Sequence, residues 1–275
     1  MPDISELKEF AKTIRLDVLD MVFNAQSGHI GGAFSSADMI AALYGYKMRV
    51  DPKNPGWEDR DRLVLSKGHS APAVYSALAR KGFFPFEDLK RLRQVDSHLQ
   101  GAATPKTPGV DMSSGPLGQG LSSAVGIALA SRINHRDYRV YCIVGDGECQ
   151  EGQIWEAAMT AAKYKLENLV CILDWNKVQM SGTNDEIMPI LDPAKKFESF
   201  GFRVNQIDGN RMEEVVKALD EATEVRTGQP VAIIADTVKG RGVSFMEGLA
   251  IWHGKAPNEE QYRLAREELE RGLEA

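Results

Sequence analysis

Val140-Tyr141-Cys142-Ile143-Val144 and Leu169-Val170-Cys171-Ile172-Leu173 are two short apolar runs, separated by the Ala-rich stretch 154–164, which has helical spacing. Strand, helix and strand in this order predict two parallel strands joined by a right-handed crossover. The first run breaks at Gly145-Asp146-Gly147 and the second at Asp174-Trp175-Asn176. Because the carboxyl ends of parallel strands share one edge of a sheet, we expect Asp146 and Asn176 close together, where open α/β sheets place their ligands.

The residue types at this edge indicate a particular ligand. A carboxylate and a carboxamide oxygen suit a hard cation that bridges a diphosphate, and the flanking glycines allow close approach of a backbone. Gly145-Asp146-Gly147 alone also fits an ordinary Asp-Gly turn. Glu148 and Glu151 follow on the same loop, where one or both would favour the start of the next helix by their charge.

The rest of the chain alternates in the same way and predicts the α/β class, with a doubly wound, mainly parallel sheet flanked by helices. We expect a single domain over residues 1–275, with a helical N-terminal arm of about sixty residues beside the sheet. Small residues in the helix 117–133 predict close packing against the sheet. The further strands expected are 63–65, 202–207 and 231–235, and the further helices are 4–23, 37–48, 69–79, 212–225 and 258–273.

Composition excludes several classes of protein. A formal net charge of −6 and a pI near 5.5 argue against nucleic-acid binding. There is no apolar run long enough to span a membrane and no signal-peptide pattern at the start, so we expect a cytoplasmic protein. Cys142, Cys149 and Cys171 lack zinc-ligand spacing and are expected to be reduced thiols.

Four of the five histidines lie in irregular segments beside or near glycine, namely His29, His69, His98 and His253. Each one taken singly fits a loop histidine without a shared task, whereas together with the expected diphosphate edge they suggest a common site. His135 fits a solvated turn. The segment 113–120 opens a helix, where its glycines either bare backbone amides to an anion or form an ordinary turn with a serine cap.

At this point the sequence closely resembles the transketolase family of thiamine diphosphate enzymes. The matching segments follow the family's order along nearly the whole chain: Ser27-Gly28-His29, Leu65-Ser66-Lys67-Gly68-His69, Thr107-Pro108-Gly109-Val110, Gly115-Pro116-Leu117-Gly118-Gln119-Gly120, Gly145-Asp146-Gly147-Glu148-Cys149-Gln150-Glu151-Gly152, Asp174-Trp175-Asn176, Lys239-Gly240-Arg241-Gly242-Val243-Ser244-Phe245-Met246-Glu247 and Trp252-His253-Gly254. Such an ordered set is far more specific than any single motif.

The resemblance implies thiamine diphosphate and Mg²⁺ as cofactors, with Ca²⁺ or Mn²⁺ as alternatives to Mg²⁺. It implies that Asp146, Asn176 and the Val178 carbonyl hold the metal. For the cofactor, it implies diphosphate contacts by the Gly147 amide, His69 and His253, aminopyrimidine binding by the Gly115 carbonyl, and packing of Leu117. For catalysis, it implies contacts to the donor sugar by His29 and His98, with His253 beside them. Glu151 would also be catalytic, at a subunit contact that links it to the carboxylate that activates the cofactor. Lys67 departs from the family pattern, where many members carry Asn, and would add charge near the phosphates.

The resemblance also implies a division between chains. Full-length members continue into a pyrimidine-binding domain and a C-terminal domain, and both are absent from this chain. We therefore expect the N-terminal subunit of a split transketolase, which transfers a two-carbon ketol unit between sugar phosphates. Its partner would be a separate C-terminal subunit in a dimer of heterodimers, covering an apolar face beside residues 115–120 and 145–155. A truncated chain would look the same.

Three other functions remain open. The first is a related transferase for an unusual sugar phosphate or a sulfosugar. The second, more distant, is 1-deoxyxylulose-5-phosphate synthase, which the Trp252-His253-Gly254 segment fits less well. The third is a cofactor-binding scaffold without catalysis.

Overall fold

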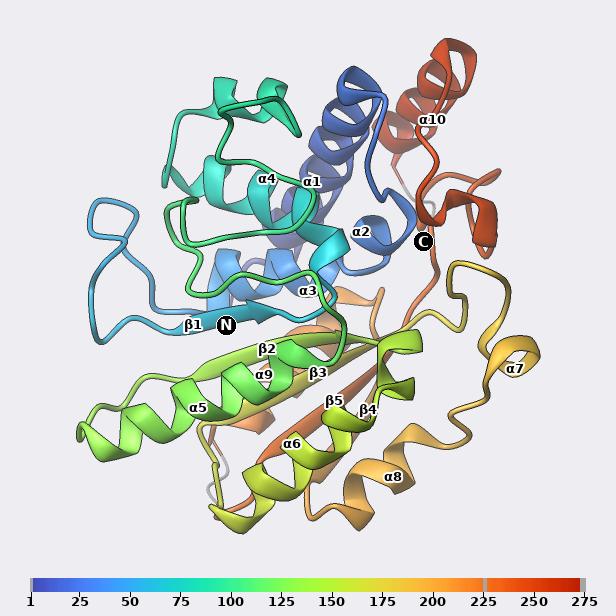
Figure 1. Cartoon of the computed structure of the whole chain (residues 1–275). Helices are drawn as coiled ribbons and strands as arrows, with labels where there is room; N and C mark the ends of the chain where they lie inside the picture. The colour runs from blue at the N-terminus through green and yellow to red at the C-terminus, as the bar shows by residue number, and fades with distance from the viewer. Residues whose placement is uncertain (1, 225–226, 273–275) are drawn as a thin grey trace.

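The computed structural model describes residues 2–224 and 227–272. Its centre is a five-stranded sheet with the order β1-β2-β3-β5-β4, in which every neighbouring pair is parallel (Figure 1). The strands are β1 (Arg62–Leu65), β2 (Val140–Gly145), β3 (Leu169–Trp175), β4 (Arg203–Asp208) and β5 (Val231–Asp236). The five strands expected from the sequence are confirmed, each within two residues at either end.

Both faces of the sheet are buried. In β2, Tyr141 and Ile143 belong to one apolar cluster, whereas Val140, Cys142 and Val144 belong to the other. A strand covered on both sides has no need of a polar face, which explains why its sequence is a continuous apolar run. The doubly wound arrangement is therefore confirmed.

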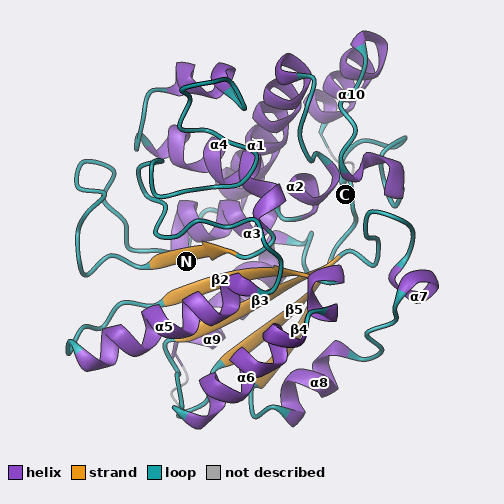
Figure 2. Cartoon of the chain, viewed as in Figure 1, coloured by secondary structure: helices purple, strands orange, loops and turns teal. Residues whose placement is uncertain are grey.

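Helices flank the sheet on both sides (Figure 2). Residues of α5, α6 and α8 pack on one face, and residues of α1 to α4, α9 and α10 belong to the cluster on the other. The helices are α1 (Ile4–Ala25), α2 (Gly31–Ser35), α3 (Ala37–Ala42), α4 (Ala71–Lys81), α5 (Gln119–Ile133), α6 (Gly152–Lys163), α7 (Asn184–Ile187), α8 (Pro193–Ser199), α9 (Met212–Glu224) and α10 (Glu259–Arg271).

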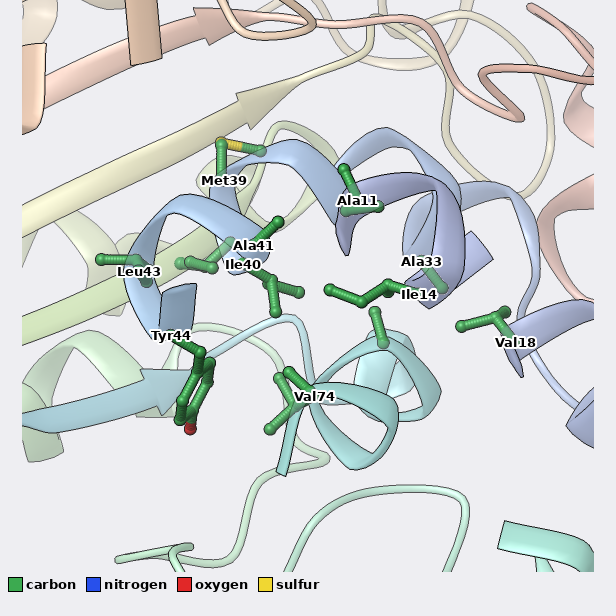
Figure 3. Packing of buried hydrophobic residues seen from close by; sticks show 14 of the residues in the cluster. Ala11, Ile14, Val18, Ala33, Met39, Ile40, Ala41, Leu43, Tyr44 and Val74 are labelled. Carbon is green, nitrogen blue, oxygen red and sulfur yellow. The ribbon is translucent and has the colours of Figure 1, made fainter. Parts of the chain in front are cut away.

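The N-terminal helices share a core with the sheet. Ile14 and Val18 of α1 pack among Ile40 of α3 and Val74 of α4, all of them buried (Figure 3). The same cluster contains Ile143 of β2. Losing the larger part of one such side chain typically costs about 2–5 kcal/mol, so this helical layer holds the loops that precede and follow it in fixed places.

Two of the expected helices have different bounds for a visible structural reason. The segment 37–48 is α3 followed by a π-helical turn over Leu43–Lys47, and a Cβ on Gly45 would lie 2.6 Å from the Leu7 side chain, so α1 approaches closely there. Helix α5 begins at Gln119 rather than at Leu117, because Gly118 has a left-handed φ of 84°. The expected ends at Val225 and Leu273 lie outside the described residues.

The expectation of close packing by α5 is confirmed. Gly120, Ala124 and Ala128 are buried along it. A Cβ on Gly120 would lie within 2.6 Å of Ser66 atoms, in the loop after β1. The small residues therefore let α5 approach the strand ends that carry the candidate site.

Candidate functional site

The carboxyl ends of four strands bring the candidate residues together. In the register of the sheet, Gly145 pairs with Asp174, and Asp174 pairs with Ala235, so β2, β3 and β5 end level with one another. The loops that follow carry Asp146, Asn176 and Lys239, and the loop after β1 carries Lys67 and His69. The expected shared edge is confirmed.

Asp146 joins the ends of β2 and β3. One carboxylate oxygen accepts a hydrogen bond from the Gly147 amide at 2.7 Å, and the other accepts from the Lys177 amide. The side chain is buried, with 4% of the residue exposed. Burial, with the charge of Asp174 adding to it, raises the pKa of Asp146 to about 6 against the opposing effect of the two amides. A divalent cation beside this carboxylate would favour its ionised form.

The other two predicted metal ligands follow β3. Asn176 Oδ1 accepts a hydrogen bond from the Val178 amide at 3.1 Å, and the Val178 carbonyl accepts one from Lys239 Nζ at 3.0 Å. Among the described residues there is no group of three or more His, Cys, Asp and Glu side chains that would suit a metal. One carboxylate, one carboxamide and one backbone carbonyl are instead an all-oxygen set, which Mg²⁺ and Ca²⁺ prefer. The donor chemistry therefore fits the expected cofactor metal.

Three histidines from three separate loops form a cluster beside this edge. Their ring centroids lie 5.3 Å apart for His29 and His69, 5.4 Å for His29 and His253, and 4.9 Å for His69 and His253. Burial, with neighbouring lysines and imidazoles adding to it, lowers the pKa of His69 well below its ordinary value. Burial followed by the charge of Lys239 lowers the pKa of His253 to about 3. The pKa of His29 is also lowered, first by burial and then by Arg93, so all three rings are neutral at pH 7.

His98 lies outside this cluster. Its Nε2 lies 3.2 Å from an Asp88 carboxylate oxygen, its Nδ1 lies 3.4 Å from the Thr107 hydroxyl, and its ring meets Phe84 edge-on. Its expected contact with the donor sugar stays a prediction. It lines a hollow of about 810 Å³ with Asp96, Ser97, Gln100, Thr104, Pro105, Lys106 and Ser113.

Two buried lysines complete the edge. Lys239 Nζ lies 3.1 Å from His253 Nδ1, and burial, together with the charge of Lys67, lowers the pKa of Lys239 to about 8. Lys67 forms an ion pair with Asp174 and donates to the Gly32 carbonyl at 2.8 Å. Burial alone would raise the pKa of Asp174, but Lys67 and the surrounding donors hold it below its ordinary value. Two ammonium groups beside a metal site suit a diphosphate.

Lys239 received no role from the sequence, although the segment Lys239–Glu247 belongs to the family resemblance. Its position just after β5 could have indicated a role in binding, because the end of that strand lies at the ligand-binding edge.

The loop that opens α5 is tied to the same edge by Glu148. One oxygen of this buried carboxylate accepts from the Gly118 amide at 2.8 Å and from the Ser66 hydroxyl, and the other accepts from the Gly145 amide at 2.9 Å. Glu148 lies in the first turn of the short helix Gly147–Gln150, as its charge would favour, and its oxygens also hold three segments together. Burial raises the pKa of Glu148.

The remaining predicted residues lie in the loop that opens α5 or in the loop after β2. Gly115 has a φ of 145°, which favours glycine, and Leu117 is 38% exposed. Glu151 is exposed, and its contact with another chain stays a prediction. The Gly147 amide, expected on the diphosphate, donates to Asp146 in this structure.

Several buried polar atoms of these loops lack a partner within the described part of the chain. They include His29 Nδ1, Ser70 Oγ, Ser114 Oγ and Gln179 Nε2. A buried polar group without a hydrogen bond typically costs about 1–3 kcal/mol. Four such atoms on loops at one edge of the sheet fit a site built for a polar ligand.

The exposed apolar residues lie partly where the sequence placed them. Leu117 is exposed as expected, and Trp155 is half-buried against Phe197 and Phe200. The exposed Met188 lies beside the segment 145–155, since its carbonyl accepts a hydrogen bond from the Gln150 side chain at 2.8 Å. The larger exposed set lies on the loops after β3 and β5 and comprises Met180, Ile187, Met188, Leu191, Leu249 and Ile251. No helix in the described ranges has the length and apolar character needed to cross a membrane.

Comparisons with known proteins show the family of this chain. The family described as transketolase, thiamine diphosphate binding domain, matches residues 6–274. The 6-deoxy-6-sulfo-D-fructose transketolase subunit of Clostridium sp. (strain MSTE9) is 44% identical, over 97% of this chain and 97% of that protein. An apulose-4-phosphate transketolase subunit from Phocaeicola vulgatus is 40% identical, over 94% of this chain and 92% of that protein.

Single-chain transketolases also match, over a smaller share of their own length. The crystal structure of transketolase from Campylobacter jejuni superimposes with a TM-score of 0.93 and 37% identity, over 98% of this chain and 43% of that chain. Human transketolase is 40% identical, and the match covers 40% of it. The chain therefore belongs to the transketolase family and corresponds to its thiamine diphosphate-binding domain.

Proposed function

We propose that this chain is the thiamine diphosphate-binding subunit of a two-chain transketolase, which moves a two-carbon ketol unit from a ketose phosphate to an aldose phosphate. The observation that carries the proposal is one sheet edge with three kinds of group. These are the oxygen donors of Asp146, Asn176 and Val178, the buried ammonium groups of Lys67 and Lys239, and the neutral imidazoles of the histidine cluster.

Each group then has a separate task. The oxygen donors would hold Mg²⁺, and Lys239 and His69 would hold the diphosphate. Thiamine diphosphate, when bound, supplies a ring that stores the electron pair released as the carbon–carbon bond of the ketose breaks. The pKa of His29 is lowered and its ring is only partly buried, so its neutral imidazole would exchange a proton with a sugar hydroxyl. Neutral rings suit this task better than imidazolium groups, which have no lone pair to accept a proton.

A second chain is part of the proposal. We propose that residues 1–275 form one cofactor-binding domain, and that the pyrimidine-binding and C-terminal domains lie on a separate subunit. Two relatives of matching length carry the word subunit in their names, which supports a heteromer. The partner chain would pack on the exposed apolar residues Met180, Ile187, Met188, Leu191, Leu249 and Ile251. We propose that the complete enzyme is a dimer of heterodimers. The cytoplasmic location stays a prediction.

The substrate is open between two related classes. An ordinary ketose phosphate is the simplest donor, but the relatives named for 6-deoxy-6-sulfo-D-fructose and apulose 4-phosphate favour an unusual sugar phosphate or a sulfosugar as the alternative. A scaffold role without catalysis is disfavoured, because the chain keeps His29, His69 and His253 in one cluster with lowered pKa values.

The test is co-expression with a candidate C-terminal transketolase subunit, followed by an assay of ketol transfer. The donors are ketose phosphates and 6-deoxy-6-sulfofructose, and the acceptors are aldose phosphates. We expect turnover that depends on thiamine diphosphate and Mg²⁺ with at least one donor. A stable complex that binds the cofactor but transfers no ketol unit from any donor would contradict the proposal.

A further inference from the structure

Asp174, at the end of β3, is a fully buried carboxylate that receives donors from four segments. The Ser35 hydroxyl of α2 lies 2.7 Å from its Oδ2, and the Thr237 hydroxyl after β5 donates to its Oδ1. Lys67 from the loop after β1 donates to Oδ2 as an ion pair. The side-chain amide of Asn176 also donates to Oδ2, at 3.2 Å. The sequence alone assigned no role to Asp174.

These contacts decide which way the Asn176 amide points. Its Nδ2 faces Asp174 Oδ2 and lies 3.4 Å from Ser35 Oγ, whereas its Oδ1 accepts from the Val178 amide at 3.1 Å. A carboxylate only accepts hydrogen bonds. Rotating the amide by half a turn would place Oδ1 against Oδ2 and leave the Val178 amide facing an NH₂ group. Asp174 therefore selects the orientation in which the oxygen of Asn176 lies on the side of the Val178 amide and its nitrogen on the side of Asp174.

Lys67 compensates the negative charge of the fully buried Asp174 carboxylate. The residues are 1% and 0% exposed, and Lys67 also donates to the Gly32 carbonyl at 2.8 Å. Removing one member of a buried ion pair is strongly destabilising, because the other charge is left without compensation. The pair thus accounts for a lysine at full burial in this chain.

We propose that Asp174 and Lys67 are positioning residues for the metal, which act by holding the Asn176 oxygen in the ligand orientation. This inference rests on the proposed function, since it assumes that Asn176 is a metal ligand. Outer contacts that orient a ligand typically contribute about 10- to 100-fold to metal affinity. A merely structural pair would alter stability without this effect.

The test is Mn²⁺ binding to the complex of this chain with its C-terminal subunit, in saturating thiamine diphosphate. The electron paramagnetic resonance signal of free Mn²⁺ measures the binding. We expect Asp174→Asn to weaken Mn²⁺ binding by roughly tenfold or more. An amide at this position presents a donor as well as an acceptor, so Asn176 can then pair in either orientation. The double variant Asp174→Asn with Lys67→Met leaves no unpaired buried ammonium, and we expect the same loss of affinity with better folding.

Asp17→Asn is the matched control. Asp17 is a buried carboxylate of α1 that accepts from the Ser76 hydroxyl at 2.6 Å and from Arg80 at 2.7 Å and 2.9 Å, within the helical layer. It should lower thermal stability but leave Mn²⁺ affinity unchanged. Wild-type Mn²⁺ affinity in the double variant, or an equal loss in Asp17→Asn, would overturn the inference. A wild-type complex without a thiamine diphosphate-dependent Mn²⁺ site would overturn the proposed function and this inference with it.

Discussion

Among single residues, Asp146 shows a conflict between stability and binding. Burial raises the pKa of its carboxyl from 3.8 to about 6, so the folded chain holds a proton there more tightly than the unfolded chain does. The free energy of unfolding therefore falls as pH rises from about 4 through 6. At pH 7 the ionised carboxylate costs the unloaded protein about 3 kcal/mol, which a bound cation would offset.

Asp146→Asn should separate these two effects. Without the buried charge, the metal-free complex should gain roughly 1–3 kcal/mol of stability at pH 7 and almost none at pH 4. Thiamine diphosphate affinity in the presence of Mg²⁺ should fall by roughly tenfold or more, because a charge-assisted contact is lost. Urea denaturation at the two pH values and a cofactor titration measure both quantities. Unchanged cofactor affinity would rule out Asp146 as a metal ligand.

The lowered pKa of Lys239 leads us to expect that cofactor affinity falls at high pH. The pKa of this buried ammonium is lowered to about 8. Below pH 8 it is charged before the anionic diphosphate arrives. Above pH 8 a proton must be taken up on binding, so affinity should fall by up to about tenfold per pH unit. In Lys239→Arg the charge persists to high pH, and the decline should disappear. The same decline in the arginine variant would assign it to another group.

The histidines should divide into two kinds by their effect on kinetics. We expect His29→Ala and His98→Ala to lower turnover or donor use more than cofactor affinity, by about 10²-fold. His69→Ala and His253→Ala should weaken the cofactor as well. Cofactor titrations beside steady-state kinetics for the four variants test this division. Identical behaviour of all four would show that the assigned roles are wrong.

How much of the site could be predicted depended on the type of residue. Asp146 and Asn176 could be placed, because each follows an apolar run and strand ends share an edge. The burial of Lys67 and Lys239 could not, because lysine is almost never buried unless it is paired. Their partners, Asp174 and the Val178 carbonyl, are far away in the sequence.

Among the secondary-structure elements, the first turn of α5 is the most constrained by its neighbours. A Cβ on Gly120 would lie 2.4 Å from the Ser66 hydroxyl oxygen and 2.6 Å from the Ser66 Cα, whereas one on Gly126, in the same helix, would meet nothing within 4 Å. The hydroxyl of Ser66 in turn donates to Glu148. The position of this turn is thus coupled to the loops that carry His69 and Asp146.

A pair of substitutions in α5 tests this coupling. Gly120→Ala should push the helix from the edge, lower stability by about 1–3 kcal/mol and weaken cofactor binding. Gly126→Ala fills open space on an exposed turn and should raise stability by about 0.5–1 kcal/mol with the cofactor unaffected. Thermal unfolding and cofactor titration of both variants give the comparison. Equal stability of the two variants would contradict the close approach of α5.

The strands and long helices could be predicted because each has an uninterrupted apolar pattern. Helix α2 could not, since Gly31 and Gly32 have poor helix propensity. Its packing explains it, because a Cβ on Gly31 would lie 2.9 Å from the Trp252 carbonyl oxygen. The packing of Trp155 against Phe197 and Phe200 could not be predicted either, because these two rings come from α8 and its C-terminal end, which lie far from Trp155 in the sequence.

For the molecule as a whole, the candidate site lies along one edge of the sheet and is flanked by exposed apolar loops. Met180, Met188, Leu191 and Ile251 are each more than half exposed there. Exposed apolar side chains beside a ligand site are typical of a surface that another protein covers. The proposed second chain would supply that cover together with the group that activates the cofactor.

The most direct test is ketol transfer by the purified chain with Mg²⁺ and thiamine diphosphate, before and after addition of the C-terminal subunit. The proposed division of the site predicts feeble cofactor binding and no turnover by the chain alone, and both tight binding and turnover by the pair. Substantial turnover by the lone chain would contradict the claim that its site is completed by a second subunit.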